Sequence, residues 1–469
     1  MKLYNTLTRS VETFDPTDKD NVRMYTCGLT VYSQPQIGNW VAYIYADVLN
    51  RTLNNSGFTV NRTQNITDVG HLVSDDDAGE DKMQKGARQE GKTAWEIADK
   101  YIAIAEDEAF NQLGLLRPTK LVRATDLIPE QIAFVEDLEA KGFTYIIPDE
   151  GVYFNTGKLD DYGKLAKLDI EGLQAGARVD VTGKRNITDF ALWKFSPKDE
   201  QRDMEWDSKW GKGFPGWHLE CSVIARENLG DQLDLHTGGI DHIPVHHTNE
   251  IAQTESVTGK KFVRHWFHNN FLKVDGTKLA KSLGNSYSLA DIKAKGFDID
   301  AFKLLVLSSH YRTEGNFTWE ILEANQNRLN KWRAVVDLRW QTTNDADETS
   351  ESHGIMRADQ FEEELRSLLE DDLNTPEVLA LIDKALDGAD QNLCRACLDS
   401  IINDIKDYLG IDLLSGKSDI TDQQKQLLTD RQQARDGKDW AKSDNIRDQL
   451  QQQGVSVRDT DFGQVWSRS

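Results

Sequence analysis

The hydrophobic positions near the start of the chain follow two alternating spacings. Residues 21–27 and 57–62 are rich in closely spaced β-forming side chains, which predicts two strands. Residues 38–56 carry apolar side chains that recur at helical spacing, and residues 93–113 predict a second helix in the same way. An alternation of strand, helix and strand predicts a parallel sheet with helices on its faces.

The pattern changes along the rest of the chain. Residues from about 120 to 205 contain short strands and more glycine and aspartate, which predicts an insertion within the α/β region. Helical spacing dominates after the sheet pattern ends near residue 290, apart from a polar stretch at about 341–358 that predicts a flexible loop. We therefore predict three domains: an α/β domain at 1–297, a helical bundle domain at 298–412 and a small C-terminal module at 421–469.

The length and composition limit the class of protein. A chain of 469 residues exceeds one compact core, and about 150 residues per domain suggests three domains. No apolar stretch approaches the ~20 residues of a membrane helix, and the start lacks a signal peptide, so we expect a cytoplasmic protein that binds no membrane. The formal net charge of −23 argues against non-specific DNA binding, but it leaves room for a local basic surface that binds RNA.

Four residues that are far apart in the sequence could bind a metal ion. His246 and Glu250 are four positions apart, so a helix would place both side chains on one face. Cys27 and Cys221 each stand alone, at a predicted strand end or beside a glycine-rich turn. Two thiolates, an imidazole and a carboxylate form an acceptable set of zinc ligands. The spacing leaves two further histidines as competing ligands, namely His242 and His247.

The other two cysteines form a Cys-x-x-Cys pair at Cys394 and Cys397. Such a pair is a conventional zinc or redox signal, but the chain has no second pair and the surrounding residues have helical spacing. So few cysteines in a long chain also argue against a disulfide framework. We therefore expect this pair to be structural.

Three short segments have the composition of nucleotide-binding turns. Residues 36–39 fall between a predicted strand and a predicted helix, and a helix N-terminus with polar side chains suits a phosphate group. Gly239 and Asp241 combine close backbone approach with an acid for a ribose hydroxyl. Residues 278–282 follow a glycine turn and contain two lysines, which suit a developing pyrophosphate. Each pattern alone also occurs in solvated loops.

Several longer segments, in order along the chain, resemble those of class I cysteinyl-tRNA synthetases. The opening stretch of that family and its "HIGH" motif are similar to residues 25–32 and 36–39. Its zinc helix resembles residues 246–253, and its "KMSKS" loop resembles residues 278–285. Further similar segments lie at residues 65–69, 189–194, 213–222, 371–376, 434–448 and 463–466. The resemblance covers nearly the whole chain.

The resemblance implies a fold and an activity. The expected fold is α/β, with a Rossmann-like parallel-sheet catalytic domain that carries the insertion, followed by the helical bundle domain and an anticodon-binding module. The expected activity is that of a cysteine–tRNA ligase, which uses ATP and L-cysteine to form cysteinyl-adenylate and then charges the 3′ end of tRNA-Cys. One Zn²⁺ per chain would select the cysteine thiolate, Mg²⁺ would accompany ATP, and we expect a monomer.

The resemblance also implies three groups of site residues. The zinc ligands would be Cys27, Cys221, His246 and Glu250. The ATP- and phosphate-binding residues would be Gln36, Gly38, Asn39, Gly239, Asp241, Lys278, Lys281 and Ser282. The cysteine pocket would be formed by Thr67, Trp217 and His236. In the C-terminal module, Trp440 and Trp466 are candidates for base stacking or for core packing.

The sequence departs from the family pattern at three places. Gln36 and Asn39 replace the first and last histidines of the "HIGH" motif, and amides can donate a hydrogen bond to phosphate but carry no positive charge. Leu279 and Ala280 replace a Met-Ser pair, and Thr248 stands where an acid is common. The first departure keeps open an inactive paralogue that binds nucleotide or RNA. A ligase that joins cysteine to an amino sugar fits less well, because such enzymes lack a tRNA-reading C-terminal module.

Overall fold

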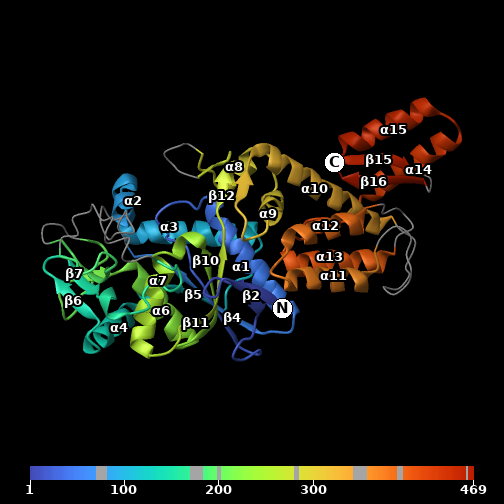
Figure 1. The fold of residues 1–469 in the computed structure, drawn as a ribbon. Helices are drawn as coiled ribbons and strands as arrows, with labels where there is room; N and C mark the ends of the chain where they lie inside the picture. Colours follow the sequence, from blue (N-terminus) through green and yellow to red (C-terminus); the bar gives the residue numbers. More distant parts are fainter. Residues whose placement is uncertain are drawn as a thin grey trace. The chain divides into compact units, whose positions relative to one another are not determined.

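The computed structural model describes residues 1–69, 82–168, 183–197, 202–278, 285–341, 356–387, 394–460 and 463–468 (Figure 1). The chain divides into two compact units, the first made of Met1–Asp291 and Tyr311–Asn316 and the second of Ile292–His310 and Phe317–Ser469. The chain first passes from one unit to the other between Asp291 and Ile292, a few residues before the domain boundary predicted at 297. Two elements cross the boundaries, namely α8 (Leu289–Ala294) and β14 (Gly315–Phe317).

The first unit contains a five-stranded parallel sheet in the order β11-β10-β3-β4-β5. Its strands are β3 (Val22–Thr26), β4 (Val60–Ile66), β5 (Lys120–Arg123), β10 (Leu233–Gly239) and β11 (Val263–Asn269). The chain builds the sheet outward from β3 to β5 and then returns to add β10 on the other side of β3. Such a reversal defines a doubly wound fold, in which ligands bind at the carboxyl ends of the strands beside the reversal. The predicted Rossmann-like fold class is confirmed.

Helices lie on both sides of this sheet, with α1 on one side and α6 and α7 on the other (Figure 1). α1 (Ile37–Asn55) confirms the helix predicted at 38–56, since its apolar side chains are buried. The second predicted strand begins later than expected, at Val60, because Gly57 adopts a positive φ of 85° in the turn that follows α1. The helices of the other side are α6 (Trp217–Leu229) and α7 (His246–Thr258), which pack against each other.

An antiparallel sheet in the order β6-β7-β8-β9 is inserted between β5 and β10. It is preceded by α4 (Ile128–Ala140), and its strands are β6 (Thr144–Ile147), β7 (Gly151–Phe154), β8 (Phe190–Phe195) and β9 (Gly213–Pro215). The antiparallel sheet runs from Thr144 to Pro215, whereas the sequence predicted an insertion from about 120 to 205. β5 belongs to the parallel sheet, and β9 of the antiparallel sheet lies beyond residue 205. The sequence could not show this, because the alternation of a short strand does not indicate which sheet the strand joins.

The remaining elements of the first unit surround these two sheets. The helix predicted at 93–113 is α3 followed by the π-helical turn η1. A capping box between Thr93 and Glu96 begins α3. The elements are β1 (Lys2–Asn5), β2 (Ser10–Thr13), α2 (Lys82–Glu90), α3 (Ala94–Glu106), η1 (Asp107–Gln112), η2 (Ala124–Leu127), η3 (Thr156–Lys158), η4 (Ile240–His242), β12 (Leu272–Val274) and β13 (Thr277–Lys278).

The second unit is mainly helical. Its helices are α9 (Ile299–Leu307), α10 (Trp319–Val336), η6 (Asp337–Trp340), α11 (Ala358–Glu370), α12 (Thr375–Leu386) and α13 (Arg395–Leu409). The C-terminal module consists of α14 (Asp422–Asp436), α15 (Trp440–Gln452), β15 (Val455–Thr460) and β16 (Gly463–Arg468). Most of the predicted loop at 341–358 lies outside the described residues. In the described part of the chain, no helix is long and apolar enough to cross a membrane.

Two pairs of residues from the sequence analysis find their places in the second unit. Cys394 caps α13, where its buried sulfur accepts a hydrogen bond from the Cys397 backbone N–H at 3.1 Å, which supports a structural role. Trp466 is buried and stacks on Trp340, with 6.3 Å between ring centroids. Trp440 is 56% exposed. Of the two stacking candidates, only Trp440 can meet a base without unfolding the module.

Candidate active site and metal cluster

A cavity of about 750 Å³ opens at the carboxyl ends of β3, β4, β10 and β11, beside the reversal in strand order. This is the position at which doubly wound sheets bind ligands. The predicted site residues that line it are Cys27, Gln36, Gly38, Asn39, Thr67, Trp217, Cys221, Gly239, Asp241 and His246. Residues that were predicted separately to bind a metal ion, phosphate or the amino acid therefore line the same cavity.

Other predicted site residues do not line this cavity. Glu250 and His236 are fully buried and lie behind its wall. Lys281 and Ser282 lie outside the described residues. Lys278 ends β13, and its side chain is likewise outside the description. The phosphate-binding lysines therefore stay predictions.

The N-terminus of α1 forms one wall of the cavity. Gln36 precedes the helix, and its backbone N–H donates to Asn39 Oδ1 at 2.8 Å. The first turn of α1 contains no acidic residue, so the positive end of the helix dipole is not neutralised there. This wall suits an anion, although its side chains are amides instead of histidines.

The opposite wall follows β10. Gly239 lies so close to Asp241 that a Cβ atom at Gly239 would stand 2.3 Å from Asp241 Oδ1. The glycine therefore lets this carboxylate fold back over the strand end, where both residues line the cavity. A Cβ at Gly238 would lie 2.7 Å from the His247 ring, so this glycine allows the imidazole to pack under the strand.

The four predicted metal ligands come together at the inner end of the cavity. Cys27 follows β3, Cys221 lies in α6, and His246 and Glu250 lie one turn apart in α7. Their ligand atoms all lie within 4.8 Å of one another. Cys27 Sγ is 4.0 Å from Cys221 Sγ, and His246 Nε2 is 3.0 Å from Glu250 Oε1. A tetrahedral zinc centre separates its ligand atoms by roughly 3.3–3.8 Å, so this donor set fits such an ion.

A second group of four overlaps the first and contains Cys27, His236, His247 and Glu250. His247 Nε2 is 3.3 Å from Cys27 Sγ, so the rival ligand left open by the sequence is close to the cluster. His247 is fully buried and does not line the cavity, whereas His246 does. An ion that has to meet a substrate therefore fits the group that contains His246 and Cys221.

The charges of the cluster favour a bound cation. A hydrogen bond with Cys27 lowers the pKa of Cys221 to about 7. Burial disfavours a charged His246, but Cys221 and Glu250 outweigh burial and raise its pKa to about 10. Although burial opposes it, His236 and His246 hold the pKa of Glu250 well below its usual range. The Cys221 thiolate and the Glu250 carboxylate therefore attract positive charge, whereas burial raises the pKa of the Cys27 thiol. A metal ion bound here would displace the protons of Cys27 and His246.

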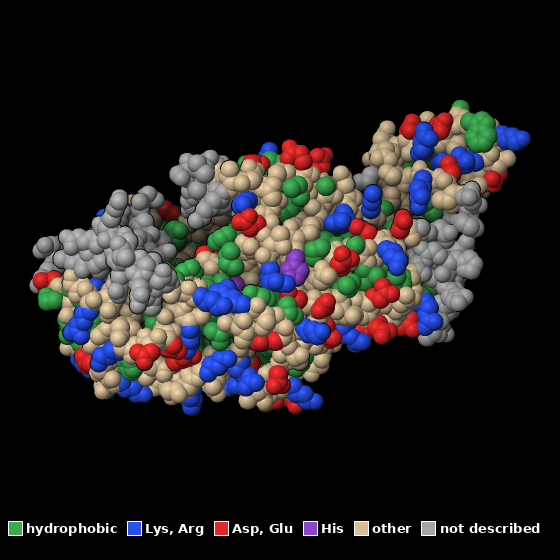
Figure 2. Space-filling view, viewed as in Figure 1, with side chains coloured by type: hydrophobic (Ala, Val, Ile, Leu, Met, Phe, Trp, Pro, Cys, Tyr) green, Lys and Arg blue, Asp and Glu red, His purple; other side chains and the backbone are tan. Residues whose placement is uncertain are grey.

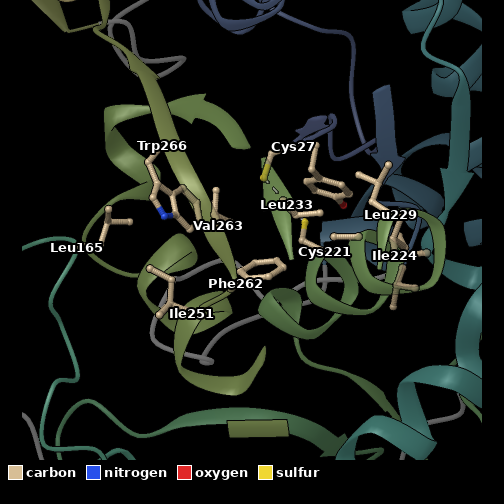
Figure 3. Close-up of a cluster of buried hydrophobic side chains, with 14 of the residues drawn as sticks. Cys27, Leu165, Cys221, Ile224, Leu229, Leu233, Ile251, Phe262, Val263 and Trp266 are labelled. Atoms are coloured by element: carbon tan, nitrogen blue, oxygen red, sulfur yellow. Dashed lines mark hydrogen bonds between the residues drawn. The ribbon is translucent and has the colours of Figure 1, made fainter. Parts of the chain in front are cut away.

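Apolar residues enclose the two cysteines of the predicted ligand set. Cys27 and Cys221 belong to a buried cluster with Leu233, Phe262 and Trp266 (Figure 3). Electrostatic attraction is stronger in such surroundings than in water. His236 extends this layer: its ring stacks on Trp266 with 4.6 Å between centroids, and its Nε2 is 2.9 Å from Glu250 Oε2. His236 therefore contacts the predicted ligand Glu250 and does not line the cavity, where the family resemblance implied a place in the cysteine pocket.

Sequence reasoning missed several residues around the site. Asn65 lines the cavity and contacts both Gly28 and Thr67. His218 Nδ1 is 3.0 Å from His246 Nδ1, so one of these two nitrogens carries the proton that they share. His268 Nε2 is 2.7 Å from His247 Nδ1. A lone asparagine or histidine within a strand or helix gives no spacing signal, so a single sequence could not have identified them.

The fold and the cavity define a class I aminoacyl-tRNA synthetase architecture. Residues 13–327 match the family described as the tRNA synthetases class I (C) catalytic domain, and residues 417–466 match the cysteinyl-tRNA ligase anticodon binding domain. The fold is similar to that of a methionyl-tRNA synthetase from Mycobacterium tuberculosis, with a TM-score of 0.57 and 14% identity over 85% of this chain and 92% of that chain.

Two curated relatives narrow the class to one family. A cysteine–tRNA ligase from Burkholderia lata is 45% identical, with 99% of this chain and 96% of the relative covered. A cysteine–tRNA ligase from Novosphingobium aromaticivorans is 40% identical, with 99% and 97% covered. The chain belongs to the cysteine–tRNA ligase family.

Proposed function

We propose that this protein activates L-cysteine with ATP and transfers the cysteinyl group to the 3′ end of tRNA-Cys. The observation that carries the proposal is the metal-binding cluster at the inner end of the cavity, where Cys27, Cys221 and His246 face the space that a substrate would occupy. The N-terminus of α1 and the strand end at Asp241 supply sites for phosphate and ribose in the same cavity.

The cluster answers a selectivity problem, because serine differs from cysteine only by oxygen in place of sulfur. The donor set of Cys27, Cys221, His246 and Glu250 would hold one Zn²⁺. When bound, Zn²⁺ supplies a soft acceptor that prefers a thiolate to a hydroxyl. The buried His236 holds Glu250, and the apolar residues around the two cysteines exclude water from this end of the cavity.

The other walls would position ATP, accompanied by Mg²⁺. The cysteine carboxylate attacks the α-phosphorus of ATP, and the bond to pyrophosphate breaks. The backbone at the start of α1, with Gln36, Gly38 and Asn39, would bind phosphate oxygens, and Gly239 and Asp241 would bind the adenosine. Lys278, Lys281 and Ser282 would stabilise the leaving pyrophosphate. Thr67 and Trp217 would complete the amino-acid pocket.

The C-terminal module would bind the tRNA anticodon. Trp440 is exposed at the start of α15, and the guanidinium of Arg435 lies 5.6 Å from its ring centroid. Lys438 and Lys442 flank it, and neither forms an ion pair in the described part of the chain. An exposed indole with nearby cations suits a stacked base and its phosphates. Acidic and basic side chains are interspersed on the face that Figure 2 shows, so the net charge of −23 is not one continuous acidic surface there.

The test is cysteine-dependent ATP–pyrophosphate exchange, followed by charging of tRNA-Cys, with bound zinc measured by elemental analysis. We expect exchange with cysteine but not with serine, charging of tRNA-Cys and one zinc per chain. Absence of exchange would support the inactive paralogue and overturn the proposal. Exchange without tRNA charging would favour a small-molecule cysteine ligase. We further expect the protein to act as a monomer in the cytoplasm.

A further inference from the structure

The side-chain amide of Asn65 links the two strand ends that carry Cys27 and Thr67. Asn65 lies near the end of β4 and is 1% exposed. Its Oδ1 accepts hydrogen bonds from the Gly28 backbone N–H at 2.7 Å and from the Tyr25 hydroxyl at 3.1 Å. Its Nδ2 donates to Thr67 Oγ1 at 2.9 Å. Because a backbone N–H can only donate, the Gly28 contact fixes which end of the amide is the oxygen.

This orientation determines what the Thr67 hydroxyl can offer to a ligand. A threonine hydroxyl has one proton and two lone pairs. The amide nitrogen of Asn65 can only donate, so Thr67 Oγ1 accepts from it and its own proton must point elsewhere. Thr67 lines the cavity, and its Oγ1 donates no hydrogen bond to any of the described residues. The proton is therefore directed to an acceptor in the cavity, such as the carboxylate or sulfur of an amino acid.

The backbone around Asn65 is held as firmly as its side chain. A Cβ atom at Gly28 would lie only 1.6 Å from the Asn65 carbonyl oxygen, so the two strand ends meet in a contact that only glycine allows. Gly28 directly follows Cys27, and residues Thr30 and Thr67 form a further bridge between the same segments. The Asn65 amide is therefore placed by rigid elements, which is what a precise hydrogen-bond orientation requires.

We propose that Asn65 is a positioning residue for the amino acid, which keeps the Thr67 hydroxyl as a hydrogen-bond donor toward the bound substrate. The inference rests on the proposed cysteine activation, and it adds to that proposal a residue that recognises the substrate through Thr67. It does not depend on which ion occupies the cluster.

Asn65→Asp is the decisive variant because it changes only one end of the side chain. The carboxylate keeps an acceptor for Gly28 and Tyr25 but replaces the donor to Thr67 with a second acceptor, so the Thr67 proton turns away from the cavity. Loss of one hydrogen bond predicts a rise of about three- to tenfold in the KM for cysteine in pyrophosphate exchange. The KM for ATP and the zinc content should stay unchanged. Asn61→Asp, at a half-buried amide of the same strand that lies away from the cavity lining, controls for the added charge.

Thr67→Val provides the second arm. It should raise the KM for cysteine as much as Asn65→Asp does, and Thr67→Ser should restore it. The two changes combined should have no larger effect than Thr67→Val alone. The inference is wrong if Asn65→Asp raises the KM equally in the Thr67→Val background, which would reveal a charge effect, or if Thr67→Val leaves the KM unchanged. If Asn65→Asp fails to fold, an unchanged KM in Thr67→Val still refutes the inference. Absence of exchange in the parent protein would instead refute the proposed function.

Discussion

His236 offers a direct test of whether a buried residue acts on the amino acid or on the metal cluster. It does not line the cavity, it is fully buried, and its Nε2 lies 2.9 Å from Glu250 Oε2. His236→Ala would leave that carboxylate oxygen without its partner. Partners of this kind typically change metal affinity by about 10- to 100-fold, equivalent to roughly 1.4–2.7 kcal/mol. We therefore expect the variant to bind zinc about 10- to 100-fold more weakly in competition with a chelating dye.

The effect on substrate binding separates the two roles. At low free zinc, the KM for cysteine in pyrophosphate exchange should rise together with the loss of metal. At saturating zinc it should return to within about twofold of the parent value, because His236 does not touch the cavity. His236→Gln, whose amide nitrogen can still donate toward Glu250, should retain most of the zinc affinity. A KM that stays high at saturating zinc would show that His236 contacts the amino acid and would refute this reasoning.

Three further predictions test other parts of the structure. Cys221→Ser should lose zinc and cysteine activation together, while Cys394→Ser, at a buried cysteine outside the metal cluster, should keep both; elemental analysis and pyrophosphate exchange would measure this. Trp466→Ala should lower the unfolding free energy by about 3–5 kcal/mol, since this side chain is buried against Trp340, whereas Trp440→Ala should change stability by less than about 0.5 kcal/mol. Trp440→Ala should instead raise the KM for tRNA by about 5- to 150-fold, and an unchanged KM would remove Trp440 from the tRNA-binding surface. Asp234 is buried and accepts hydrogen bonds from the Thr17 and Arg23 backbone N–H groups; these bonds outweigh burial and lower its pKa. Because its folded pKa lies below the unfolded value of about 3.9, its stabilisation is present above that pH and is lost as the pH falls through the folded pKa. Asp234→Asn should therefore unfold at lower urea concentration at pH 7, by about 1–3 kcal/mol, and the difference from the parent should shrink below pH 4.

The fold class could be predicted because local spacing and global architecture agree. α1 has a clear helical stripe and β3 a clear strand pattern, and their alternation requires a parallel sheet. The limits of the insertion could not be predicted. β5 and β9 are short strands of similar local character, yet one joins the parallel sheet and the other the antiparallel sheet. Which sheet a strand joins depends on contacts with distant segments, and no local pattern records these.

The metal cluster also depends on contacts between distant segments, which local sequence patterns do not show. The spacing of His246 and Glu250 could suggest a shared helix face, but it could not exclude His247. An amphipathic helix would have shown which face meets the cavity, yet residues 246–254 of α7 are all buried. The convergence of Cys27 and Cys221 depends on β10 returning beside β3, which is a property of the strand order. Only the order of several long motifs could select the four ligands from sequence.

Residues that act through another residue are the hardest to predict. His236 and Asn65 have the composition of ordinary buried polar groups, and each fills a hydrogen-bonding requirement of a neighbour. Each of them orients a neighbouring side chain. His236 contacts one particular oxygen of Glu250, and Asn65 determines the direction in which the Thr67 hydroxyl donates its proton. A hydroxyl that accepts from one side must donate toward another, so a buried amide can determine what a cavity offers without touching the substrate. Recognition of the amino acid at this site therefore depends on whether the Thr67 hydroxyl donates or accepts, which is determined by Asn65, a residue that does not itself contact the ligand.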